Sequence, residues 1–582
     1  MDRLSKVSAF QLSVKLDRKL VLELLTLAGI TALALLLRWT ASLQNGVSVF
    51  PDDDSYWHYH LEEQIVQFGH RLNPDTQAWL PLGRPETHPP LFHYAVAYAY
   101  LFLHYIGSGV SLFTVAYYSN LPAIILGVVS IYLLVRELYG RIPALSAALL
   151  FATLPPSISE SLISVNKPAY ATSWLCILGF WLFVRARRKD DRLSLVFPGV
   201  LLGIASLAWE GTLYFFPPVL FGAWLLEVVR RRASRRLTVL TWVTLGIFGA
   251  IASLWYAPIF LTYGLWSHSN TPAVMLADSN WTVAPTLFGT PVVNTEGKYV
   301  PSYSLVGDFG PLLFLGVLAL PFILLKGKTE DSLGFVWLSF GAIAPFLVGE
   351  TTLDYLTLFG LIVVLSWVLS KLPVSNGGTR TLVRRRVIKS GRSDLHVYEA
   401  SLVLLLVIGS GLYLGTESAL NPPGILLGGQ DVNKIPPKGS VVLAWWDQSG
   451  PFEALGDRVF WDLYLEHVPA SMAHQDQLIG CIYLSNVTAA YAKLKALNVS
   501  YVHVAGGYFY VVAPLVNACG LPGSPSDYYQ IGSSQTLPVI EPPARSLFLS
   551  LMLNESSSLS PHFKLVYSSD YPAIRLYQVL SP

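Results

Sequence analysis

Long apolar segments recur through the first 416 residues of the chain, and they decide which kind of fold it can adopt. Each is roughly 15–24 residues long, close to what a helix needs to cross the hydrocarbon core of a bilayer. Because unpaired backbone groups are costly in lipid, such segments must form helices. Eleven of them are predicted to span the membrane: 20–39, 116–135, 142–156, 169–186, 194–209, 212–229, 237–257, 310–326, 333–349, 354–371 and 397–416.

The composition agrees with a polytopic membrane protein. Only 13% of the residues are charged and 53% are hydrophobic, whereas a soluble domain carries about 25% charged residues. The formal net charge of +2 gives no reason to expect a nucleic-acid partner.

Basic clusters determine the predicted topology, because cytoplasmic loops collect Lys and Arg. All of them fall on one side, with a cytoplasmic N-terminus, if the ambiguous apolar segment 89–107 does not cross the membrane alone. We therefore interpret 89–107 as a non-spanning helix or as one member of a pair, which gives about 11–13 membrane helices. The clusters lie at 136–141, 185–191, 230–236, 325–328 and 380–392.

This topology divides the chain into two predicted domains. Residues 1–416 form a multi-pass domain in the cell membrane, with long external loops at 40–115 and 258–309. Residues 417–582 form an extracytoplasmic domain, which is long enough to bury its own core. Four Asn-x-Ser/Thr tripeptides fall on the external side, at Asn280, Asn486, Asn498 and Asn554.

The C-terminal domain is predicted to be mixed α/β. Strand-like segments at 439–446 and 499–506 enclose a segment with helical spacing at 489–498. Cys481 and Cys519 also lie in this domain and could form a disulfide on the external side of the membrane, but the sequence leaves their pairing open.

An acidic stretch, "VFPDDDSYWHYHLEEQIVQFGHRLN" (49–73), follows the first span. Aspartates at the start of a helix-like segment can serve as helix caps. One aspartate suffices for a cap, however, and the three adjacent carboxylates Asp52, Asp53 and Asp54 repel one another unless a cation lies nearby. The alternative prediction is a divalent metal site or a catalytic base.

The same loop continues with "PLGRPETHPPLFHY" (81–94), which supplies Arg84 and His88. Cationic and hydrogen-bond donor groups beside carboxylates are suited to binding the phosphate of a lipid-linked donor. We therefore predict that this loop contacts such a phosphate.

A third motif, "SVVLAWWDQSG" (440–450), ends a strand-like segment of the C-terminal domain with Trp445, Trp446 and Asp447. Two tryptophans at the end of a strand can simply pack in a core. They can also line a pocket from which their rings exclude water, and in which a carboxylate accepts a hydrogen bond from a ligand hydroxyl.

These motifs together resemble a known family. The Asp-Asp-x-Tyr pattern after the first span and the following Pro-Pro-Leu-Phe segment are similar to the GT-C superfamily of membrane glycosyltransferases. The segments "WWDQSG", "FEALGDRVFWD" (452–462) and "KLKALNVSYVHV" (493–504) resemble one family within it, the catalytic subunit of oligosaccharyltransferase in its archaeal single-subunit form.

The resemblance implies an activity and its partners. The reaction is transfer of an oligosaccharide from a polyprenyl (dolichyl) phosphate or pyrophosphate to the Asn of an Asn-x-Ser/Thr sequon, which is protein N-glycosylation. Asp54 and Asp53 are the implied catalytic carboxylates, with Mn²⁺ or Mg²⁺ as the implied cofactor. Trp445, Trp446 and Asp447 are implied to bind the acceptor hydroxyl. The implied partners are the membrane, a lipid-linked oligosaccharide and a sequon peptide, with room for further membrane subunits.

The chain departs from the family pattern at the other acidic motifs. No carboxylate follows the "SV" at 164–165; Lys167 lies there, and Glu160 lies upstream. In the second long loop Pro285 stands where the family has an acid, and Glu296 comes eleven residues later. The candidate metal ligands are therefore Asp54, Glu160 and Glu296. Lys167 is either a solvated loop residue or a third phosphate-binding candidate, beside Arg84 and His88, whose ammonium partly replaces a metal.

Three hypotheses follow from these departures. The chain is a true transferase with relocated carboxylates, or a GT-C enzyme that uses a monosaccharide-lipid donor without metal. The third hypothesis is a catalytically degenerate paralogue that binds acceptor or lipid as a scaffold. Glycopeptide formation distinguishes the first from the other two.

Overall fold

The computed structural model describes most of the chain, and the fold below refers to those residues. They are 18–44, 50–159, 161–188, 193–263, 309–348, 354–372, 392–420, 432–445, 448–460, 475–505, 519–520, 546–554, 559–570 and 573–581.

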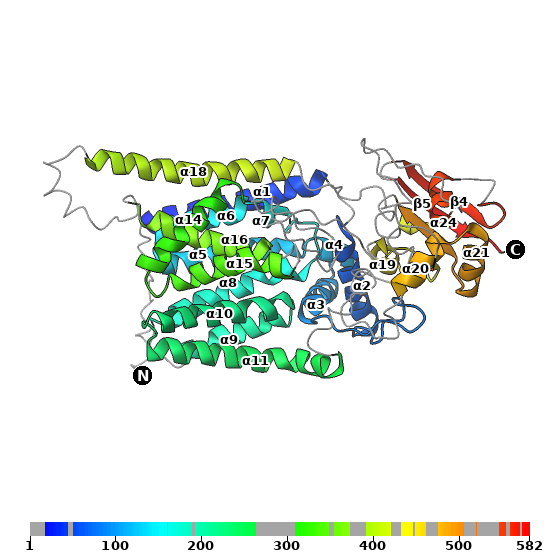
Figure 1. Cartoon of the computed structure of the whole chain (residues 1–582), viewed down its shortest axis with the longest axis horizontal. Helices are drawn as coiled ribbons and strands as arrows, with labels where there is room; N and C mark the ends of the chain where they lie inside the picture. Colours follow the sequence, from blue (N-terminus) through cyan, green and yellow to red (C-terminus); the bar gives the residue numbers. More distant parts are fainter. Residues whose placement is uncertain are drawn as a thin grey trace, which may run out of the picture.

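The larger part is a bundle of roughly parallel helices with a smaller sheet-containing part at one end (Figure 1). Each of the eleven predicted spans coincides with a helix of this bundle or, at 116–135, with the pair α4–α5. The helices are α1 (Arg18–Gln44), α4 (Leu112–Tyr117), α5 (Asn120–Tyr139), α6 (Arg141–Thr153), α7 (Pro155–Ser159), α8 (Pro168–Ala186), α9 (Leu193–Ser206), α10 (Gly211–Val229), α11 (Arg235–Tyr263), α14 (Pro311–Lys326), α15 (Ser332–Val348), α16 (Asp354–Ser370) and α18 (Arg392–Leu420).

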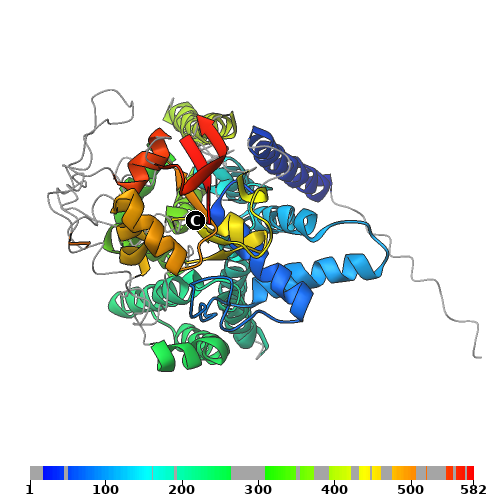
Figure 2. The same ribbon diagram turned by 90° about the vertical axis from the view of Figure 1, so that its right-hand side faces the viewer.

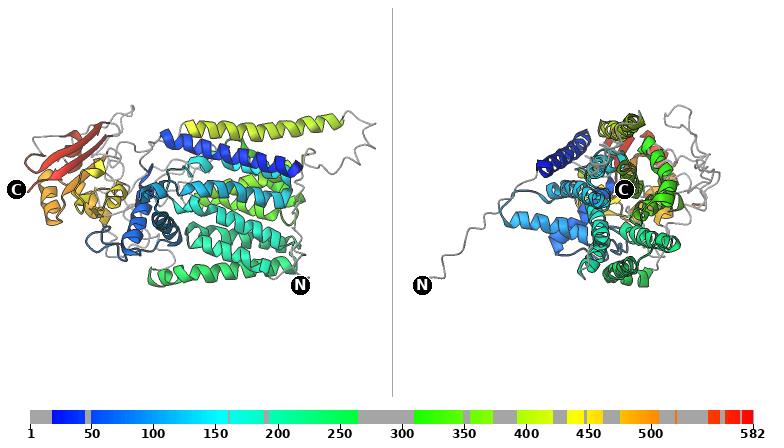
Figure 3. Two further views of the ribbon diagram at one scale, coloured as in Figure 1. Left: turned by 180° about the vertical axis from the view of Figure 1, so that it is seen from behind. Right: turned by 90° about the vertical axis from the view of Figure 1, so that its left-hand side faces the viewer.

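The chain is a multi-pass membrane protein. Five helical stretches within the described residues are long and apolar enough to cross a bilayer, and six shorter apolar helices accompany them. Large apolar side chains point outward on the bundle surface, for example Leu254 at 75% and Leu325 at 73% exposed. A helix that is apolar on all sides is stable in a lipid environment, where outward leucines meet acyl chains instead of water. From behind, α1 and α18 lie side by side along one edge of the bundle (Figure 3).

Two further helices lie between the bundle and the sheet-containing part (Figure 1), and the view from the sheet end shows them in blue at the lower right (Figure 2). The acidic stretch forms α2 (Asp53–Phe68), and the ambiguous apolar segment forms α3 (Leu91–Tyr105). At 1.5 Å per residue, α3 is about 22 Å long, short of the ~30 Å hydrocarbon core. Its Phe102 and Tyr105 side chains are 63% and 87% exposed. Such aromatic residues are typical of a helix that rests at the membrane–water interface.

The C-terminal part is a mixed α/β domain, as the sequence predicts. Its five-stranded sheet has the order β2-β1-β3-β5-β4, parallel at β2–β1–β3 and antiparallel at β3–β5–β4. The elements are η5 (Val432–Lys434), β1 (Val441–Leu443), α19 (Gly450–Ala454), β2 (Arg458–Val459), α20 (Gln475–Leu484), α21 (Val487–Ala496), β3 (Tyr501–Ala505), α24 (Leu547–Leu553), β4 (Phe563–Asp570) and β5 (Ala573–Val579). A disulfide joins Cys481 of α20 to Cys519.

The "LGDR" segment (455–458) has a structural role in this domain. Asp457 is 1% exposed, and its Oδ1 accepts the Ser440 N–H at 3.2 Å, which fixes the turn before β1. Burial raises the pKa of Asp457 to about 7, although the Ser440 and Gly439 N–H groups act in the opposite direction. The folded protein therefore holds this proton more tightly than the unfolded chain does.

This raised pKa predicts a pH dependence of stability. A carboxyl group with a raised folded-state pKa stabilises the fold below its unfolded pKa near 4, and this contribution is lost as the pH rises through about 7. We expect the free energy of unfolding, and with it the thermal unfolding midpoint, to fall between about pH 4 and pH 7. The loss of free energy is a few kcal/mol at most, since one pKa unit is about 1.4 kcal/mol. Asp457→Asn should flatten this slope, and superimposable pH profiles of the two proteins would contradict the assignment.

Candidate active site

Tertiary packing brings two of the predicted motifs together. Helix α2 carries Asp54 directly after the first span, and α19 begins at Gly450 as the WWDQSG motif ends. These two helices pack against each other (Figure 1). The acidic stretch and the C-terminal motif, almost 400 residues apart in the sequence, therefore belong to one region of the molecule.

The segment between α2 and α3 is also part of the C-terminal domain's core. Ala78, Trp79 and Leu80 are buried with the apolar residues of the sheet. The Leu80 N–H donates to the Val459 carbonyl at 3.2 Å, and the Val459 N–H donates to the Gln77 carbonyl at 2.8 Å. Because backbone hydrogen bonds fix its position, this loop ties α2 to the sheet.

One of the three aspartates takes the helix-capping role that the sequence predicts. Asp52 is the N-cap of α2, and its Oδ1 accepts the Ser55 N–H at 3.0 Å. Asp54 lies within the first turn, and its carboxylate is 35% exposed. The side chain of Asp53 lies outside the described residues.

Lys167 meets both described carboxylates. Its Nζ lies 2.5 Å from Asp54 Oδ2 and 2.8 Å from Asp52 Oδ2, while its own side chain remains 20% exposed. This ammonium supplies a cation beside the neighbouring Asp52 and Asp54 carboxylates. The pair of ion contacts distinguishes Lys167 from a solvated loop lysine.

A network of asparagines positions Lys167. The Asn120 Nδ2 donates to the Leu162 and Val165 carbonyls at 3.1 and 2.8 Å, which fixes the short loop before α8. The Asn166 N–H donates to Ser55 Oγ at 3.0 Å, and Asn166 Nδ2 donates to Glu62 Oε1 at 3.1 Å. The loop is therefore docked along α2, and the next residue reaches Asp54.

The 81–94 loop is held by buried ion pairs. Glu86 accepts from Arg84 Nη2 at 3.1 Å and from Arg71 Nη1 at 3.3 Å. The Arg84 guanidinium also lies 4.6 Å from the Trp57 ring centroid, where a cation is attracted to the π face. Arg84 and His88 are only 4% and 6% exposed. Of the three predicted phosphate-binding residues, Lys167 is therefore the most accessible one.

Three histidines beside this loop were not singled out by the sequence reasoning as a group: His58, His88 and His93. Burial lowers their pKa values well below the ordinary histidine value, and nearby positive groups lower them further. Both effects favour the neutral form of these imidazoles. In the sequence, the four-residue spacing of Asp54 and His58 indicates that these two residues share a face of one helix. No comparable local pattern connects His58 with His88 or His93.

Of the other predicted site residues, only Trp445 lies within the described part of the chain. Trp445 is fully buried in the core of the C-terminal domain. Trp446, Asp447, Glu160, Pro285 and Glu296 lie outside the described residues. The roles of all the site residues remain predictions.

Comparison with known proteins agrees with this geometry. Residues 24–270 match the family model described as oligosaccharyl transferase STT3, N-terminal. That span contains Asp54, the 81–94 loop and Lys167. The chain resembles the catalytic subunit of oligosaccharyltransferase.

Relatives of the same type are found among archaeal proteins. The chain is 30% identical over 201 residues to dolichyl-phosphooligosaccharide-protein glycotransferase 2 of Archaeoglobus fulgidus, a match that covers 34% of this chain and 32% of that protein. It is 25% identical over 303 residues to the Pyrococcus furiosus protein of the same name, covering 51% and 38% respectively. The aligned region thus spans about a third of the length of these relatives.

Solved oligosaccharyltransferase structures share the fold. The Archaeoglobus fulgidus enzyme AglB, in complex with an inhibitory peptide and a dolichol-phosphate, matches with a TM-score of 0.67 at 18% identity, over 95% of this chain and 80% of that one. Another A. fulgidus oligosaccharyltransferase structure, in complex with Zn and sulfate, matches with a TM-score of 0.61. The chain therefore has a GT-C-like membrane fold with a C-terminal α/β domain.

Proposed function

We propose that this chain is a membrane glycosyltransferase of protein N-glycosylation. It would move an oligosaccharide from a dolichyl phosphate or pyrophosphate donor to the Asn of an Asn-x-Ser/Thr sequon. The observation that carries this proposal is the packing of α19 on α2. It puts the segment that follows the WWD motif next to the helix that bears Asp54 and its Lys167 partner.

The chemistry assigned to these residues follows from the reaction. The Asn amide nitrogen attacks the anomeric carbon, the bond from that carbon to the phosphate oxygen breaks, and the phosphate leaves with the electron pair. An amide nitrogen is a weak nucleophile because its lone pair is delocalised. Asp54 would accept an amide N–H and then its proton, while Lys167 would offset the negative charge that develops on the phosphate.

The metal that the resemblance implies does not fit the described residues. Mn²⁺ and Mg²⁺ take about six oxygen ligands, of which one or two are usually carboxylates and the rest waters or phosphate oxygens. The two carboxylates described beside Lys167, Asp52 and Asp54, are both engaged by its ammonium. Glu160 and Glu296 lie outside the described residues. We therefore assign the local positive charge to Lys167 and derive no step through a metal ion.

Acceptor recognition is proposed for the WWD segment. Trp445 is fully buried, so its role would be to anchor the segment in the core of the domain. Asp447 would then accept the hydrogen bond of the sequon hydroxyl beside Trp446. A site that pairs one hydroxyl rejects acceptors without it strongly, because its polar groups are otherwise left unpaired.

We further propose a cytoplasmic N-terminus and an extracytoplasmic C-terminal domain. The basic clusters support this orientation. The Cys481–Cys519 disulfide supports it too, since disulfides persist on the oxidising side of a membrane. The proposed partners are a lipid-linked oligosaccharide and a sequon-bearing protein, with room for further subunits.

A direct assay tests the activity. Purified full-length chain, dolichyl-linked oligosaccharide and an Asn-x-Thr peptide should yield a glycopeptide detectable by mass spectrometry, whereas Gln-x-Thr and Asn-x-Ala peptides should not. Peptide binding without any product would favour the second candidate, a scaffold. That candidate is supported by the ion pair in which Lys167 occupies the Asp54 carboxylate.

The assignment of Lys167 predicts how the reaction depends on cations. Added Mn²⁺ or Mg²⁺ should leave the transfer rate unchanged, and Lys167→Met should lower it about 10²-fold by removing a charge aimed at the phosphate. Lys167→Asp should create a Mn²⁺ site visible by electron paramagnetic resonance, and adding Asp54→Asn should remove it again. Wild-type transfer that requires Mn²⁺ and survives Lys167→Met would refute the assignment.

A further inference from the structure

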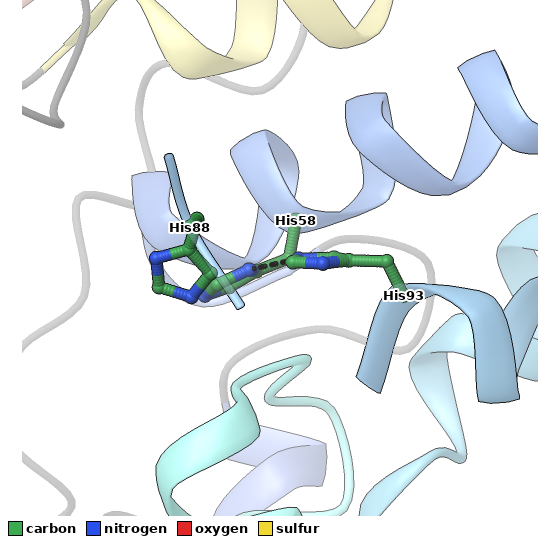
Figure 4. A group of neighbouring side chains, drawn as sticks. All are labelled: His58, His88 and His93. Carbon is green, nitrogen blue, oxygen red and sulfur yellow. Dashed lines mark hydrogen bonds between the residues drawn. The ribbon is translucent and has the colours of Figure 1, made fainter. Parts of the chain in front are cut away.

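Three histidine side chains converge from three segments of the first external region (Figure 4). His58 comes from α2, His88 from the loop that follows it, and His93 from α3. One ring nitrogen from each lies within 4.8 Å of the others. The three side chains are buried, at 1%, 6% and 0% exposed.

The spacing of these nitrogens is close to that of a metal site. His58 Nδ1 and His93 Nε2 lie 2.8 Å apart and share a hydrogen bond, which an ion bound between them would replace. Around a tetrahedral zinc with Zn–N bonds of 2.0–2.1 Å, two ligand nitrogens are about 3.3 Å apart. Small rotations of the two rings would therefore admit an ion between them.

The surroundings of the rings match those of metal-bound histidines. Such histidines usually donate their second ring N–H to a carboxylate or a backbone carbonyl, which orients the ring. His88 Nδ1 lies 3.3 Å from Glu210 Oε2, and that contact leaves Nε2 to face the other rings. His93 hydrogen-bonds the backbone carbonyl of Pro89. Two of the three rings thus have an orienting partner.

Local charge also determines what such a site would accept. Arg71 Nη1 lies 3.5 Å from His93 Nδ1 and is itself paired with Glu86. Neutral imidazoles suit zinc and its neighbours in the transition series, whereas magnesium and manganese prefer oxygen ligands. The guanidinium beside the cluster would favour an anion or hydroxide as the fourth ligand.

We propose that His58, His88 and His93 bind one transition-metal ion of the zinc class. The ion would clamp α2, the 81–94 loop and α3 together. His58 is one helical turn after Asp54 on the same face of α2, so the clamp would hold the helix that carries the Asp54–Lys167 pair. The site is distinct from that pair and does not depend on the proposed transferase activity.

Metal titration in the absence of donor and peptide tests the proposal. The full-length chain, purified in detergent with a tag that contains no histidine, is stripped with a chelator and titrated with Co²⁺. We expect one ion per chain with the visible bands of tetrahedral Co²⁺, displaced by Zn²⁺. His58→Ala or His93→Ala should abolish these bands, and Glu210→Gln should weaken binding about 10–100-fold.

Matched controls separate the site from adventitious binding. His70 is exposed on the same loop, and His70→Ala should leave stoichiometry and affinity unchanged. Zn²⁺ should raise the thermal unfolding midpoint of the wild type and of His70→Ala, but not of His93→Ala. Unchanged Co²⁺ binding in His58→Ala and His93→Ala, or no stoichiometric binding by the wild type, would overturn the proposal.

Discussion

Replacing Asp54 with asparagine is expected to lower glycopeptide formation by about 10²–10³-fold or more. Asparagine keeps the size of the side chain but removes the negative charge that accepts the amide N–H. It also breaks the 2.5 Å ion pair with Lys167, which then no longer has a fixed position beside the phosphate. The measurement is the initial rate with saturating peptide and donor.

A carboxylate elsewhere in the molecule provides the control. Glu137 pairs with Arg188 at 2.8 Å on a partly exposed surface of the bundle. Glu137→Gln removes a comparable ion pair far from α2 in the sequence and should leave the rate unchanged. The two variants should bind the sequon peptide equally well. A rate within twofold of wild type for Asp54→Asn would remove Asp54 from the mechanism.

The largest effect on stability is expected at Arg38, which is fully buried in the bundle. Its guanidinium donates to the Ala152 carbonyl at 2.9 Å, to the Ser157 carbonyl at 2.7 Å and to Ser161 Oγ at 2.7 Å. It thereby joins α1 to the end of α6 and to α7. Arg38→Met would remove all three donors. The Ser157 carbonyl would keep only the Ser161 hydroxyl, and an acceptor left without a donor costs about 1–3 kcal/mol.

We therefore expect Arg38→Met to prevent accumulation of folded protein or to reduce its unfolding free energy by several kcal/mol. The readouts are the monodisperse yield in detergent and the thermal unfolding midpoint. Arg188→Met is the matched control, because Arg188 is exposed and its ion pairs should contribute less than about 1 kcal/mol. Equal midpoints for the two variants would contradict the role assigned to Arg38.

Much of the architecture could be predicted from local pattern. Apolar segments of spanning length become helices because lipid leaves the backbone no other partner. The strand–helix–strand order around 489–498 reappears as β1, α21 and β3. Asp52 was likewise predictable as a helix cap, because it caps an N–H group only three residues away. These features depend on residues within a few positions of one another.

The sequence alone thus determined a multi-pass helical protein with a C-terminal α/β domain, and its motifs carried the resemblance to a known family. Only the tertiary structure decided that α19 packs on α2, that Lys167 reaches Asp54, and that His58 and His93 meet. The Lys167–Asp54 pair joins residues more than 100 positions apart. Such contacts depend on how the helices pack and on how Asn166 holds its loop against α2. Short-range periodicity in the sequence does not predict either of them.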